Sequence, residues 1–136
     1  MTSLTIRNYL ASLFPGDLIV NGASTEAPSI SVFPGPEARG GKTPFLGGVE
    51  CDDFHKMPIN ILVRWSTDTN VAYQKAHSIY KSLVGLHNFK FESAEIAFIS
   101  LLDDQPMWVG RDSKNVVEFI IRADIYYYQE VSNEAL

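Results

Sequence analysis

Residues 115–129 constrain the fold of this chain more than any other segment, because apolar and polar side chains alternate along them. One parity is apolar and comprises Val117, Phe119, Ile121, Ala123, Ile125 and Tyr127. The other parity is mixed and comprises Glu118, Ile120, Arg122, Asp124, Tyr126 and Tyr128. A period of two with one apolar face is typical of a half-buried β-strand. We therefore predict a strand over residues 115–129.

This predicted strand is longer than a small domain needs to cross its own core. At roughly 3.3 Å per residue it extends over about 45 Å. A strand that extends beyond its core either bends or offers its spare edge to a neighbour. Arg122 and Asp124 carry opposite charges on its outer face. We expect a flanking strand or a second subunit to contact them there.

The remaining periodic segments supply two helices and several shorter strands. Apolar residues at helical spacing predict one helix over residues 3–14, capped by Ser3, and another from the cap Asp68 to about Val84. Alternation predicts further strands at residues 17–20, 29–33, 57–67, 95–102 and 107–110, the first two as a hairpin. Runs of strands beside two helices indicate a single α+β domain, with a mostly antiparallel sheet packed by both helices.

One long irregular region interrupts this pattern at about residues 34–56. Its first twenty residues contain three prolines and five glycines, and few large apolar side chains. Loops of this length are uncommon inside a compact domain and are often functional. We predict a mobile arm or loop here.

Composition excludes several functional classes. The chain has 136 residues and a formal net charge of −5, and its basic residues are scattered, which argues against duplex-DNA binding. A single cysteine, Cys51, excludes an internal disulfide. Neither a signal peptide nor a run of 18 apolar residues is present, so we expect a soluble protein made in the cytoplasm, with no membrane contact.

Three groups of residues suggest chemistry, but their spacing fits none of it well. Gly41-Lys42-Thr43 matches the end of a phosphate-binding loop, yet Pro36 replaces the required glycine and Pro44 follows directly. The acidic group at residues 50–55, with Cys51 and His55, lacks the paired spacing of a zinc site. Asp103-Asp104 precedes a proline, which is typical of a turn. We therefore predict no catalytic, cofactor or metal site.

Exposed aromatic side chains are the remaining candidates for binding. On a strand, Tyr126 and Tyr128 point outward while Tyr127 points inward, and Trp65 and Trp108 lie on other strands. Tyrosine and tryptophan are enriched in protein interfaces. The alternative is that these rings fill the second face of the sheet beneath a helix, and the sequence leaves both interpretations open.

Three segments together resemble a known family. Pro58–Arg64 (PINILVR), Ala72–Leu83 (AYQKAHSIYKSL) and Met107–Tyr127 (MWVGRD…VVEFIIRADIYY) resemble small minor capsid proteins of tailed bacteriophages and prophages, which are similar to tail terminator, or head–tail joining, proteins. The resemblance extends from about Ile30 onward. It implies an α+β subunit of the virion that assembles in the host cytoplasm.

This resemblance also implies partners and an interface, but no catalytic residues or cofactor. The subunit is expected to form a homo-oligomeric ring, with six members, between the phage tail tube and the head–tail connector. The interface candidates are Arg39, Lys42, Arg122, Asp124, Tyr126 and Tyr128. Arg39 and Lys42, in the long loop, are candidates to meet another subunit or DNA, although no specific nucleic-acid binding is expected.

Two hypotheses from other classes remain open. A small cytoplasmic hydrolase or ligand-binding domain would bring Asp103, Asp104 or His87 together in a pocket with a strongly shifted pKa. An adaptor would bind a peptide along a free strand edge.

Overall fold

The long C-terminal strand lies at the centre of the sheet. In the computed structural model, which describes residues 2–24, 26–35, 41–42 and 54–128, strand β8 extends over Val117–Tyr128. Strand β4 (Phe54–Arg64) pairs with β8 along its whole length on one side. Strands β6 (Ala94–Leu101) and β7 (Met107–Arg111) follow one another along the other side. The strand itself is confirmed, and of the two neighbours expected beside it, a flanking strand or a second subunit, the described residues show flanking strands on both sides.

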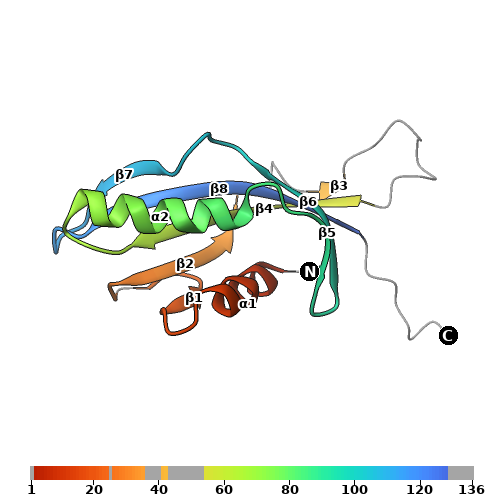
Figure 1. Cartoon of the computed structure of the whole chain (residues 1–136), viewed down its shortest axis with the longest axis horizontal. Helices are drawn as coiled ribbons and strands as arrows, with labels where there is room; N and C mark the ends of the chain where they lie inside the picture. Colours follow the sequence, from red (N-terminus) through yellow and green to blue (C-terminus); the bar gives the residue numbers. More distant parts are fainter. Residues whose placement is uncertain (1, 25, 36–40, 43–53, 129–136) are drawn as a thin grey trace.

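The described residues form one sheet of eight strands, in which the β1–β2 pair is parallel and the other pairs are antiparallel. The order is β1-β2-β4-β8-β6-β5, with β3 beside β4 and β7 beside β8 (Figure 1). The remaining strands are β1 (Ile19–Asn21), β2 (Ser29–Pro34), β3 (Gly41–Lys42) and β5 (His87–Phe91). The sheet curls into a half-barrel. The α+β class, with two helices against a mostly antiparallel sheet, is confirmed.

Strands β1 and β2 are parallel, so the predicted hairpin is wrong. Ile19 lies beside Ile30, and the backbone N–H of Ile30 donates to the carbonyl of Leu18 at 2.9 Å. The residues after Asn21 carry the chain back to the start of β1 before β2 begins. Arg64 of β4 donates hydrogen bonds to the carbonyls of Ser24 and Glu26 in this connection. A residue about forty positions away in sequence therefore fixes the path of the β1–β2 connection, and the local turn residues could not predict this contact.

Both helices were predicted close to their observed bounds. Helix α2 (Thr69–Leu83) begins as expected at Asp68, whose Oδ1 accepts hydrogen bonds from the backbone N–H groups of Asn70 at 2.9 Å and Val71 at 3.2 Å. Helix α1 extends over Ser3–Leu13. Ser3 does not cap it, because Thr2 holds that position and the Ser3 hydroxyl donates to Oδ1 of Asn21 instead.

The core lies between the helices and one face of the sheet. The apolar parity of β8 meets the matching parity of β4, for example Ile121 beside Ile61 and Phe119 beside Val63. These side chains form one buried cluster with the helix residues Ile6, Leu10, Ala72, Ala76, Ile79 and Leu83. The opposite parity of β2, β4 and β8 forms a second face that no described helix covers. We call it the helix-free face, and it carries Phe33, Leu62, Ile120, Arg122, Asp124 and Tyr126.

Part of the long loop predicted at about residues 34–56 is strand. Gly41 and Lys42 form β3 and pair with Lys56 and His55, and β4 already begins at Phe54. Residues 36–40 and 43–53, where most of the mobile arm or loop was predicted, lie outside the described residues. Pairing with β8 and β3 extends β4 in a segment that has no alternation of its own. Strand β5 is the other omission, since no strand was predicted over residues 87–91, where His87 pairs with Phe98 of β6.

Candidate assembly surface

Arg122 is held by a partner within its own subunit. Its Nε donates to Asp103 Oδ2 at 3.0 Å and its Nη2 donates to Oδ1 at 2.8 Å, which is the paired geometry that arginine and carboxylate favour. This carboxylate raises the pKa of Arg122 above its ordinary value. The Arg122 side chain keeps 41% of its surface exposed. It is therefore both accessible and fixed in direction.

Asp124 lies on the predicted face of β8 but is more buried than an outer-face residue was expected to be. Its exposed fraction is only 6%, because Pro58 of β4 and Ser100 of β6 flank it across the sheet. Flanking strands therefore meet Asp124, as one of the two expectations had it, while Arg122 binds Asp103. The strands on both sides of β8 cause this difference.

The tyrosines at the end of β8 alternate as predicted. The Tyr126 ring stacks on Phe98 of β6 with a centroid distance of 4.4 Å and an interplanar angle of 16°, on the helix-free face. The Tyr127 ring stacks on His55 at 5.5 Å. Burial first, and then the negative charge of Asp124, raise the pKa of Tyr126. Tyr126 and Tyr128 are each half-buried, so part of each side chain remains available for contact.

A bulge explains why Phe98 joins Tyr126. Ile96 pairs with Tyr127 and Phe98 with Tyr126, so two steps along β6 correspond to one along β8. Ile96 is consequently buried in the core while Phe98 is 38% exposed on the helix-free face. Simple alternation along residues 95–102 places both side chains on one face.

Helix α2 and β8 together hold the segment between β6 and β7, residues 102–106. The Tyr80 hydroxyl donates to the Asp103 carbonyl at 2.6 Å, and the Tyr73 hydroxyl donates to Gln105 Oε1 at 3.4 Å. Burial, followed by the charges of Asp104 and Asp103, raises the pKa of Tyr80. With Arg122 on the other side, these contacts fix how the chain enters β7.

Four apolar side chains are exposed along this segment and β7. Leu102 is 38% exposed, Met107 41%, Trp108 51% and Val109 51%. The Trp108 ring packs edge-on against Phe119 at 5.7 Å, and so does Tyr73 at 5.5 Å, so the indole is fixed although half of it is exposed. Sequence reasoning identified Trp108 as a candidate for contact but missed its neighbours, because their exposure depends on β7 having no described strand beyond it.

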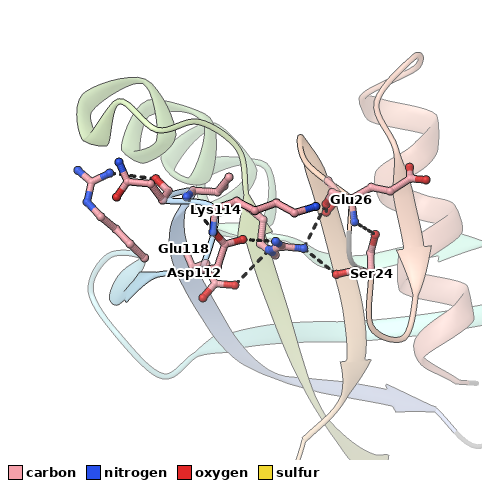
Figure 2. Close-up of polar contacts among 10 residues, drawn as sticks. Ser24, Glu26, Asp112, Lys114 and Glu118 are labelled. Carbon is pink, nitrogen blue, oxygen red and sulfur yellow. Dashed lines mark hydrogen bonds and ion pairs between the residues drawn. The ribbon is translucent and has the colours of Figure 1, made fainter.

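Arg64 is the polar centre at the other end of β8. It is 8% exposed and forms an ion pair with Asp112 and another, at 3.2 Å, with Glu118 Oε2. Figure 2 shows Asp112 and Glu118 on one side of this centre and Ser24 and Glu26 on the other. The arginine joins β4, the β7–β8 turn and the β1–β2 connection. Its donors are directed to partners within the subunit, so we assign it a structural role.

His87 does not join Asp103 and Asp104 in the described structure. The two aspartates line a depression of about 510 Å³ formed by residues 102–108, and His87 is not among its lining residues. The Asp103 carboxylate binds Arg122, while His87 Nδ1, on β5, lies 2.9 Å from the Gly85 carbonyl.

The other candidate sites give no chemistry either. Gly41 and Lys42 lie in a strand rather than before a helix, as a phosphate-binding loop requires. Across the part of the chain that the structure describes, no three His, Cys, Asp or Glu residues gather to hold a metal ion. Arg39 and Cys51 lie outside that part, as does the side chain of Lys42. None of the described helices is long and apolar enough to cross a membrane.

Comparison with known proteins decides the family. The model of the family described as bacteriophage tail terminator protein matches residues 21–129. The chain belongs to this family. No curated protein matches it. The match begins at the last residue of β1 and includes β2 to β8 and α2, so in this tail terminator the match leaves out α1. The resemblance to tail terminator proteins is thus confirmed, and with it a structural rather than enzymatic family of the phage head–tail region.

Proposed function

We propose that this tail terminator assembles into a ring of six subunits that ends the tail tube at the head–tail junction, as a minor structural protein of the virion. The family match over residues 21–129 carries the proposal. Rings of identical subunits need surfaces that bury apolar area on association, and the exposed side chains of β7 meet that need. The partners are the tail tube and the connector, and assembly takes place in the host cytoplasm.

The helix-free face supplies polar and aromatic groups for such contacts. Arg122 and Tyr126 lie on it, each accessible and each oriented by a neighbour, Asp103 or Phe98. Tyr128 follows on the same strand parity. We retain these three with Arg39 and Lys42 as interface residues. Asp124 is left out because it is buried.

Two measurements test this function. Native mass spectrometry of the chain over a concentration series should show a closed ring near six subunits. Electron microscopy of phage tail tubes mixed with the chain should show a ring at one tube end and no further tube growth there. A chain that neither forms rings nor binds tube ends at any concentration would contradict the proposed function.

A further inference from the structure

Exposed apolar side chains gather at two opposite edges of the subunit. Ten large apolar side chains of the described residues are exposed, and six lie in two groups. The first is the β7 edge, with Leu102, Met107, Trp108 and Val109. The second, which we call the α1–β1 edge, has Leu13 at the end of α1 and Leu18 just before β1.

The sheet order sets these groups on opposite sides. Strand β1 pairs only with β2 among the described strands, β7 pairs only with β8, and β4 lies between β2 and β8. Figure 1 shows β7 along one margin of the molecule and α1 with β1 along the other. Two different apolar surfaces on opposite sides of one subunit are the arrangement that a head-to-tail contact between identical copies requires.

The middle of β7 carries no charge. Residues 107–110 are uncharged and the exposed charge of this strand, Arg111, lies at its end, whereas β5, which ends the sheet beyond β6, has an exposed Lys90. A bulge between Trp108 and Gly110 disfavours continuous strand pairing with a partner. The contact is therefore made by side chains, with Trp108 as its fixed anchor.

We infer that the β7 edge of one subunit docks on the α1–β1 edge of a second copy, so that the same contact repeats around the ring. This inference rests on the proposed function and names the surfaces that it uses. The clamp of Tyr80 and Arg122 on residue 103 orients the docking strand before association. Less conformational entropy is then lost on binding.

Three variants, each of which replaces an exposed apolar residue with lysine, test the contact. Val109→Lys changes the β7 edge and Leu13→Lys changes the α1–β1 edge, at the end of α1 where a cation is tolerated. Val84→Lys is the matched control, because Val84 is 53% exposed, against 51% for Val109, and lies at the end of α2. Circular dichroism and thermal unfolding establish that each variant folds. Met107→Lys and Leu18→Lys replace any variant that does not.

Native mass spectrometry then distinguishes the possible contacts. We expect rings from wild type and Val84→Lys, and monomers from Val109→Lys and Leu13→Lys, with association weakened by about tenfold or more. A mixture of the two edge variants should give a heterodimer and nothing larger, because each pair retains one intact junction. If either variant forms homodimers alone, the contact is symmetric and the inference is wrong.

The remaining outcomes distinguish a failure of this inference from a failure of the proposed function. Rings from both edge variants would overturn the inference and leave the proposed function standing. A wild-type chain that binds tube ends but never self-associates would also overturn it. Failure of both ring formation and tube binding would instead contradict the function itself.

Discussion

The guanidinium of Arg122 and the carboxylate of Asp103 form a two-point contact that joins the centre of β8 to the segment leading into β7. A residue predicted from sequence as a contact for a neighbouring subunit thus has a partner in its own subunit. Because β7 carries three exposed apolar side chains, the pair links the helix-free face with the proposed β7 edge.

We expect Arg122→Ala to weaken ring assembly while the monomer stays folded. Its loss releases residues 102–106 and removes a charged group from the helix-free face. Tyr126→Ala should also weaken assembly, since it removes the ring that stacks on Phe98. Sedimentation velocity measures assembly, and circular dichroism measures folding. Wild-type assembly by both variants would count against this face.

Asp103→Ala separates two roles of Arg122. If Arg122 acts by positioning the segment before β7, Asp103→Ala should reproduce the assembly defect. If the guanidinium contacts a neighbouring subunit directly, Asp103→Ala should assemble like wild type. Lys90→Ala is the charge control, since it removes an exposed cation on β5 and should leave assembly unchanged.

Tyr80 and Tyr73 give a matched pair for stability. We expect Tyr80→Phe to lower the free energy of unfolding by about 1 kcal/mol, because it removes a 2.6 Å hydrogen bond to a part-buried carbonyl. Tyr73→Phe should have a much smaller effect, since its hydroxyl bond is exposed and 3.4 Å long. Urea denaturation compares the two variants. Equal losses would show that the Tyr80 hydroxyl does not hold residue 103.

The sequence predicted the structural features that depend only on neighbouring residues. The alternation of β8, the cap at Asp68 and the core stripe of α2 follow from side-chain periodicity and capping chemistry, and all are present. The parallel β1–β2 pair was not predictable, because Arg64 holds the connection between them from a distant strand. The burial of Asp124 likewise depends on strands that flank β8 on both sides.

The candidate surface was only partly predictable for the same reason. Arg122, Tyr126 and Trp108 could be named from their chemistry and parity. The exposure of Met107 and Val109 could not, because it depends on which strand lies at an edge of the sheet. The Arg122–Asp103 pair could not be predicted either, because Asp103 lies in a turn whose position is set by α2 and β8.

Two adjacent isoleucines on β8 test the assignment of its faces. Ile121 is 1% exposed in the core, whereas Ile120 is half-buried on the helix-free face. We expect Ile121→Ala to cost about 2–5 kcal/mol of unfolding free energy, the usual range for a buried isoleucine. Ile120→Ala should cost clearly less. Chemical denaturation of both variants measures these losses of unfolding free energy. Similar losses would mean that the helix-free face is as tightly packed as the core.

Asp112 predicts how stability responds to acid. The hydrogen bond from Arg64, followed by backbone hydrogen bonds from Val116 and Lys114, lowers the pKa of this carboxyl below its ordinary value of 3.8. A lowered pKa in the folded state means that the ionised form stabilises the fold. This contribution is fully present above the unfolded pKa and is lost as pH falls through the folded pKa.

We therefore expect wild type to lose stability below about pH 4 more steeply than Asp112→Asn. At neutral pH the variant should already be less stable, because Arg64 loses a charged partner inside the subunit. Urea denaturation at pH 7, 5 and 3 measures both effects. Parallel pH profiles for the two proteins would show that Asp112 does not contribute to the acid response, and would locate that response in other carboxyl groups.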